Sequence, residues 1–472
     1  MAEMTRKTFK YDMRRGLGSC AAALKNMQDE EKEKFQPLVL WGCSRDMAYD
    51  AQCEGCRSAY LHELILEFPD VEPFIDVITK RLFRCMGSTG WEFLQDCQLL
   101  AYFVSDGVRR AWHVLTKCYE LLLETLSGKR NCAAYAQLRE RNNFESLCIA
   151  LVSQCFEDRE RREKLYQKVV RDLGFLAEDN ELYDVSDFYW FQTVCEDCLG
   201  KKTVHRLLHR ADADEHTKTY AHLMESYQNT WEEAWRQHRR EEPETAEMLY
   251  GLMRNGEIVG RMWTPVLARR WLNQDKDQEV LQLAGYYREE NDPEVRYQLL
   301  RLLANEVCAR MLDLTRLIED SKSEHSELSR WAFEALAYRT DEKVRAYALE
   351  LLQSGTHTAR AVSMLAANYE DRDKELFVCA VKQIPITYGN GEWHGVFKDV
   401  MDLFDTPGGK KPKELLPYMY RNTLCSFCRE CVVKEMGRRR MLTQELLEEM
   451  RYDCNQEIGR YADKKLSRSA LL

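Results

Sequence analysis

Hydrophobic residues recur at spacings of three and four along most of the chain, which is the period of an amphipathic helix. The pattern is clearest in residues 293–303, where Val295, Leu299, Leu302 and Leu303 fall on one face of a helix. Alternating runs of β-branched residues, which mark strands, are scarce. The pattern therefore predicts an all-α protein.

Local signals at helix ends divide the C-terminal third into short helices. Asp292 can cap a helix that begins at Pro293, where the missing N–H costs nothing. Further helices are expected over residues 326–338, with Ser326 as the cap, and over residues 340–355, with Gly355 ending the helix. Two more are expected over residues 356–369 and 371–384.

These predicted helices repeat at intervals of about 32 residues per pair. The segments DPEVR (292–296), DEKVR (341–345) and DCNQEIGRYA (453–462) resemble the Asp-x-x-Val-Arg signature of HEAT-like repeats. In the third segment Gly459 stands where the family has arginine. The resemblance implies that an arginine and an aspartate in each repeat tie neighbouring turns together, here Asp292, Arg296, Asp341 and Arg345.

The expected architecture is an α-solenoid, a superhelix of HEAT-like helix pairs, because a single pair cannot bury its apolar face alone. We expect an N-terminal repeat-like region (1–129), an irregular helical middle region (130–290) and C-terminal HEAT-like repeats (291–472). Residues 49–57 and 452–460 share the pattern Tyr-Asp-x3-Glu-x2-Arg, which hints at a repeat unit near the N-terminus as well.

Composition narrows the class of protein. The chain has 472 residues, of which 45% are hydrophobic and 31% charged, as in folded soluble proteins. Its formal net charge of −10 argues against nucleic acid as the main partner. The longest apolar run covers residues 147–156, far short of the roughly 20 residues that span a bilayer. We therefore expect no membrane partner, and a cytoplasmic location in which the 18 cysteines are reduced thiols.

One short segment contains the residue types of a zinc site. Cys195, Cys198, His205 and His209 form a C-x2-C-x6-H-x3-H array, and zinc prefers tetrahedral sulfur and nitrogen ligands. The cysteines, however, continue an apolar stripe, whereas the histidines lie beside the inward stripe of the next predicted helix. We expect the cysteines to pack in the core and the histidines to lie at the surface, and keep zinc as the alternative.

Two further cysteine clusters lack a complete ligand set. Cys53 and Cys56 have no nearby partner pair, and Cys425, Cys428 and Cys431 lack the fourth cysteine of a ferredoxin run. No predicted strand precedes any of the pairs, as it would in a redox Cys-x-x-Cys. On a helix the last three form one drifting stripe, so we expect small buried residues between stacked helices.

No complete catalytic constellation is present: the chain lacks Gly-x-Ser-x-Gly, a P-loop and His-Glu-x-x-His. The loop TPGGKKPKE (406–414) carries three lysines and is a candidate anion site. We expect no cofactor and a non-catalytic scaffold that binds a protein or peptide on a curved helical surface. The alternative is a nucleic-acid binder or a DNA glycosylase-type enzyme with a local basic groove, since some HEAT-like proteins are glycosylases for alkylated bases.

Overall fold

The computed structural model describes residues 4–86, 91–127, 141–179, 189–240, 243, 245–256, 265–274, 276–387, 392–406 and 408–469. It contains two compact units. The first unit comprises residues 1–237, 424–430 and 440–472, and the second comprises residues 238–423 and 431–439.

The first unit contains α1 (Arg6–Arg15), α2 (Ser19–Lys25), α3 (Asp29–Lys32), α4 (Gln36–Cys43), α5 (Ala51–Glu54), α6 (Ser58–Ile65), α7 (Glu72–Cys85), α8 (Trp91–Ser105), α9 (Arg109–Leu126), α10 (Arg141–Ser153), α11 (Arg159–Asp179), α12 (Tyr189–Leu199), α13 (Lys201–Leu208), α27 (Gln444–Met450) and α28 (Gln456–Ser469). The boundaries between the units fall inside α14 (Glu215–Arg240) and α26 (Ser426–Arg438).

The second unit contains α15 (Ala246–Arg254), α16 (Pro265–Leu272), α17 (Asp277–Glu289), α18 (Pro293–Leu303), η3 (Cys308–Met311), α19 (Leu314–Ser321), α20 (Ser326–Ala337), α21 (Glu342–Ser354), α22 (Thr358–Ala367), η4 (Asp371–Asp373), α23 (Lys374–Gln383), α24 (Glu392–Asp405) and α25 (Leu415–Asn422).

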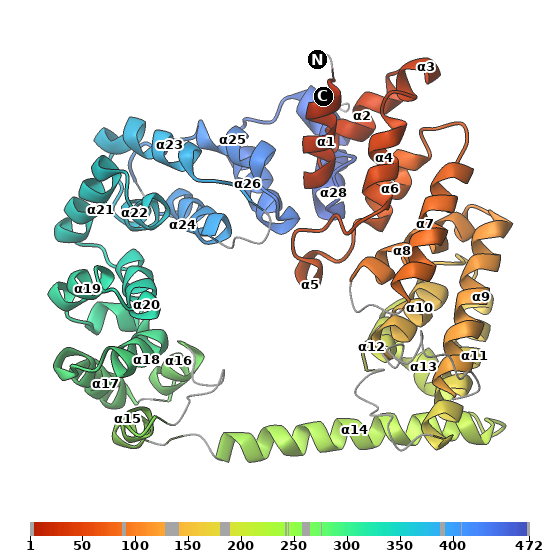
Figure 1. Ribbon diagram of the computed structural model, residues 1–472, viewed down its shortest axis with the longest axis horizontal. Helices are drawn as coiled ribbons and strands as arrows, with labels where there is room; N and C mark the ends of the chain where they lie inside the picture. Colours follow the sequence, from red (N-terminus) through yellow and green to blue (C-terminus); the bar gives the residue numbers. More distant parts are fainter. Residues whose placement is uncertain are drawn as a thin grey trace. The chain divides into compact units, whose positions relative to one another are not determined.

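The predicted all-α class is confirmed. The part of the chain that the structure describes is helical throughout and holds no strand (Figure 1). Within the same residues, no helix has both the length and the apolar character needed to cross a membrane.

The helix ends in the C-terminal third follow the predicted signals with one exception. Asp292 caps α18 by accepting a hydrogen bond from the backbone N–H of Glu294 (2.9 Å), and Gly355 ends α21 in the left-handed conformation at φ 69°. The exception is α20, whose cap is not Ser326. The cap is His325, whose Nδ1 accepts from the N–H of Leu328 (3.1 Å). Histidine is an unusual cap, and residue preferences point to the serine beside it.

The second unit is built from consecutive helix hairpins. One row of helices runs through α16, α18, α20, α22 and α24, each in contact with the next in the row. The intervening helices α17, α19, α21 and α23 each pack against a member of this row, and Figure 1 shows α19 and α21 on one side of it. Each helix thereby covers the apolar stripe of its neighbours, and every hairpin depends on the adjacent one for burial.

Arginine–aspartate pairs link successive turns of the chain. Arg296 contacts Asp320 (2.7 Å), and Arg345 contacts Asp373 (2.6 Å). Each arginine is the fourth residue of its helix, α18 or α21, and its partner lies at the end of the next hairpin helix or in the turn that follows it. The two arginines therefore have the structural role that the sequence resemblance implies. Asp292 and Asp341 instead cap α18 and α21 through backbone N–H groups.

A third pair of the same kind lies in the first unit. Arg429 is the fourth residue of α26, and its guanidinium donates to both carboxylate oxygens of Asp453 (2.7 and 2.8 Å). Neither side chain is exposed. The sequence prediction looked for the last repeat's arginine at position 459. There the chain has glycine because a Cβ at this position would lie 3.0 Å from the carbonyl oxygen of Arg451.

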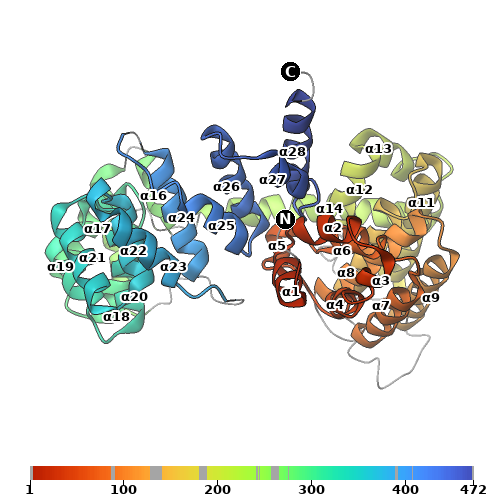
Figure 2. The same cartoon turned by 90° about the horizontal axis from the view of Figure 1, so that it is seen from above.

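Segments from both ends of the chain pack together in the first unit. α27 contacts α2 (Figure 2). The backbone N–H of Cys454 donates to the carbonyl oxygen of Gly16 (2.9 Å). Gly16 has φ 70°, and a Cβ there would overlap Cys454, so only glycine fits. The contact joins residues more than 400 positions apart in the sequence.

A buried ion pair on the N-terminal side fixes the segment that begins α26. Arg57 contacts Glu54 (2.7 Å), and both side chains are almost fully buried. Arg57 also donates to the carbonyl oxygen of Leu424 (3.3 Å), and Glu54 accepts from the N–H of Ser426 (3.0 Å). In the similar segment 452–460, Glu457 and Arg460 are exposed, so the two segments play different structural roles.

We predict that Arg429→Ala lowers the free energy of unfolding of the first unit by about 3–5 kcal/mol, because it leaves the buried Asp453 carboxylate unpaired. Urea unfolding followed by circular dichroism measures this loss. The control is Arg438→Ala, which removes an exposed arginine from the same helix and should cost less than about 1 kcal/mol. Equal losses in the two variants would contradict the structural role of the pair.

Candidate functional site

A cavity of about 520 Å³ opens on the helix row of the second unit. It lies over three consecutive members of the row, α20, α22 and α24. Its lining consists of small, aromatic and charged residues: Arg330, Phe333, Glu334, Ala337, Tyr338, Ala359, Arg360, Ser363, Glu392, Gly395, Val396, Lys398 and Asp399.

Small residues create the hollow. Ala337, Ala359, Ser363 and Gly395 occupy positions where larger side chains would fill the space between the helices. A Cβ added at Gly395 would meet no atom within 4 Å, so this face of α24 borders open space. Glycine in the middle of a helix costs about 1 kcal/mol relative to alanine. No close packing against Gly395 within the fold compensates for this cost.

Charges of both signs surround the hollow. The lining includes three basic side chains and three carboxylates, and Arg360 and Glu334 contact each other across α22 and α20 (3.6 Å). Burial raises the pKa of the Tyr338 hydroxyl, and the nearby Lys398 opposes this shift. The cavity is therefore charge-balanced, and it lacks the excess of basic groups that a nucleic-acid groove needs.

Asp399 has the most perturbed acid–base behaviour in this cavity. Burial raises its pKa from 3.8 to about 6, and the carboxylates of Glu334 and Asp402 add to the increase. A hydrogen bond from Ser363 and the charge of Lys398 act in the opposite direction. Near pH 6 the carboxyl group can therefore either donate or accept a hydrogen bond.

Sequence reasoning missed this cavity. The turn-forming residues of PITYGNGEW (385–393) predict a loop, but α24 already begins at Glu392, while residues 388–391 lie outside the described part of the chain. The helix places Gly395 and Asp399 one turn apart, on the face that meets α22. The only signal in the sequence was a glycine inside an otherwise helical pattern.

The four residues of the zinc hypothesis occupy two neighbouring helices. Cys195 is fully buried on α12, and Cys198 is half-buried. His205 and His209 are exposed, at α13 and its C-terminal end, with their rings 4.4 Å apart. Among the described residues, no group of three or more possible ligand atoms within 4.8 Å of one another includes any of these four. The structure brings each pair together but not one pair to the other.

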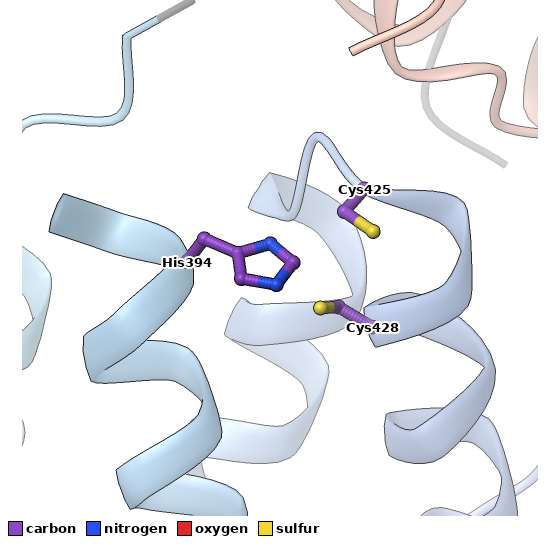
Figure 3. A group of neighbouring side chains, drawn as sticks. All are labelled: His394, Cys425 and Cys428. Carbon is purple, nitrogen blue, oxygen red and sulfur yellow. The ribbon is translucent and has the colours of Figure 1, made fainter. Parts of the chain in front are cut away.

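The cysteines of α26 differ from the predicted stripe. Helix α26 begins at Ser426, so Cys425 precedes the helix and Cys428 lies in its first turn. Cys425 is buried and Cys428 half-buried, but Cys431 is exposed, contrary to the expected burial of all three. Figure 3 shows the sulfur atoms of Cys425 and Cys428 at the start of α26, and it also draws His394 of α24, which belongs to the second unit.

The lysine-rich loop holds a carboxylate next to its backbone. The N–H of Lys410 donates to the carboxylate of Asp371 (2.8 Å), and Lys411 donates to Thr406 (2.7 Å). An anion bound at the N–H of Lys410 would have to displace a negatively charged side chain. The local geometry thus gives no support to the anion-site prediction.

Comparisons with protein families and with curated proteins identify no relative of this chain. No protein-family model matches the chain, and none of the curated proteins does. The fold and the cavity define the class directly: an all-helical protein whose second unit presents an open, charge-balanced hollow on a row of packed helices.

We predict that Asp399→Asn stabilises the protein at pH 7 by about 1–2 kcal/mol and has no effect at pH 4. The raised pKa means that the folded protein binds this proton more tightly than the unfolded chain does. Asp399 therefore destabilises the fold progressively as the pH rises from about 4 to about 6.

Urea unfolding at pH 4, 5, 6 and 7 tests this prediction. The control is Asp405→Asn, on the same helix but exposed, which should change stability by less than about 1 kcal/mol at every pH. An Asp399→Asn gain that is the same at pH 4 and pH 7 would rule out burial of the charge as its cause.

Proposed function

We propose that this protein is a non-catalytic cytoplasmic scaffold, built as a HEAT-like α-solenoid, that binds a segment of another protein on the helix row of its second unit. The observation that carries the proposal is the cavity over α20, α22 and α24, where small residues leave an open hollow between charged side chains of both signs.

The chemistry of the lining favours a polypeptide. Phe333, Tyr338 and Val396 offer apolar contact for one inserted side chain, and a buried anchor of this kind supplies most of the affinity in many protein interfaces. Arg330 and Arg360 can meet carboxylates, while Glu334 can meet a basic side chain. A polypeptide carries all three kinds of group, whereas a nucleic acid presents a uniform row of phosphates.

The repeat architecture also supports the proposal. The arginines at the fourth position of α18, α21 and α26 each pair with an aspartate in a later turn, which is the recurring tie expected of stacked repeats. Stacking leaves one face of each hairpin uncovered along the whole row, and proteins of this class bind partners on such faces.

We predict that Gly395→Leu weakens partner binding at least tenfold, or about 1.4 kcal/mol, without destabilising the fold. The leucine side chain enters the hollow, where a Cβ meets no atom within 4 Å, and leucine is the better helix former. Loss of binding therefore cannot be explained by unfolding. The matched control is Gly285→Leu on α17, another helical glycine with open space around its Cβ.

The experiment uses a photo-crosslinking amino acid at position 395, with position 285 as the control, in the cytosol of the source cell. We expect one protein to be crosslinked from position 395 and not from position 285, and its affinity for the purified chain to fall with Gly395→Leu. The proposal fails if both positions give the same products. It also fails if the chain binds duplex DNA in a salt-dependent way that Gly395→Leu abolishes, which would support the nucleic-acid alternative.

A further inference from the structure

The first unit contains a pair of thiols placed for redox chemistry. Cys425 and Cys428 lie within 4.8 Å of each other, measured between their sulfur atoms, at the start of α26 (Figure 3). A Cys-x-x-Cys pair at a helix N-terminus is the arrangement in which thiolates are stabilised by backbone N–H groups. This pair lies outside the cavity proposed to bind a partner.

The surroundings of the pair hold it in place in the reduced protein. The carbonyl oxygen of Leu424 accepts from Arg57, and the N–H of Ser426 donates to Glu54, so the backbone is fixed on both sides of Cys425. Glu54 and Arg57 are themselves an almost fully buried ion pair. The two sulfur atoms are therefore kept close together by the fold.

Local hydrogen bonds also activate the pair. A hydrogen bond from the Cys428 thiol and backbone N–H groups of Phe427 and Cys428 lower the pKa of Cys425 from 9.0 to about 6, against the opposing effects of burial and of Glu54. The two thiols share one proton near neutral pH, so the negative charge belongs to the pair. The half-buried Cys428 is the member of the pair nearer to solvent.

The other Cys-x-x-Cys pairs of the chain differ in position. Cys195 and Cys198 lie in the C-terminal part of α12, where burial raises the pKa of Cys195 and a hydrogen bond from Cys195 lowers the pKa of Cys198 to about 7. In the pair Cys53 and Cys56, Cys56 makes hydrogen bonds to Gln98 and Ser58, and Cys53 is exposed. The pair Cys428 and Cys431 lies wholly inside α26. Only at α26 does the first cysteine of such a pair precede the helix, among the residues that the structure describes.

We propose that Cys425 and Cys428 form a redox-active dithiol that is oxidised to a disulfide by a low-molecular-weight disulfide such as oxidised glutathione. The shared proton first shifts from Cys428 to Cys425. The resulting Cys428 thiolate, which is nearer to solvent, attacks one sulfur of the glutathione disulfide, forming a mixed disulfide and releasing one glutathione thiolate. Cys425 then gives up this proton to the released thiolate and attacks the Cys428 sulfur, which expels the second glutathione thiolate. Two protein thiols lose two electrons, and one glutathione disulfide gains them.

The test incubates the purified full chain with oxidised glutathione at pH 7, blocks remaining thiols by alkylation, and maps disulfides by peptide mass spectrometry. We expect a Cys425–Cys428 disulfide that reduced glutathione reverses, and no corresponding Cys195–Cys198 disulfide. Before oxidation, the alkylation rate of the pair should rise with a midpoint near pH 6. Cys425→Ser should abolish this early rise, and it should fold normally because serine is a favoured N-cap residue.

The matched control is the double variant Cys195→Ser, Cys198→Ser, which should leave oxidation of Cys425 and Cys428 unchanged. The proposal is overturned if excess oxidised glutathione produces no Cys425–Cys428 disulfide, or if Cys195 and Cys198 oxidise equally readily. It is also overturned if the purified chain holds one equivalent of zinc that protects Cys425 and Cys428 from alkylation.

Discussion

Buried arginine–carboxylate pairs are the constraint on which the rest of the structure depends. Arg429 and Asp453 have no exposure to solvent, and a buried charge is tolerated only where its partner is held in the right place. Arg57 and Glu54 add a second such pair in the same region. Through further hydrogen bonds to Leu424, Ser426 and Gly16, the two pairs join segments from both ends of the chain.

The same type of pair organises the second unit in a different way. Arg296 and Arg345 each reach an aspartate one hairpin further along, so each turn of the chain is tied to its neighbour and not to a distant segment. The hollow over α20, α22 and α24 lies on this row of hairpins, and a Cβ at its Gly395 would meet no atom within 4 Å.

Two of the Cys-x-x-Cys pairs differ in their place relative to a helix end. Cys195 and Cys425 both begin such a pair, but burial inside α12 raises the pKa of Cys195, whereas a hydrogen bond from Cys428 and the N–H groups at the start of α26 lower the pKa of Cys425. The sequence expectation treated residues 425–431 as one stripe of small core residues. The start of α26 at Ser426 separates Cys425 from the helix and leaves Cys431 exposed.

The sequence by itself determined the all-α class and most helix ends, because hydrophobic period and capping depend on residues only a few positions apart. It also identified Arg296 and Arg345 as structural residues. Only the tertiary structure decided their partners Asp320 and Asp373 and the cavity on the helix row. These features depend on contacts between segments tens or hundreds of residues apart, and neither local period nor capping carries information about such contacts.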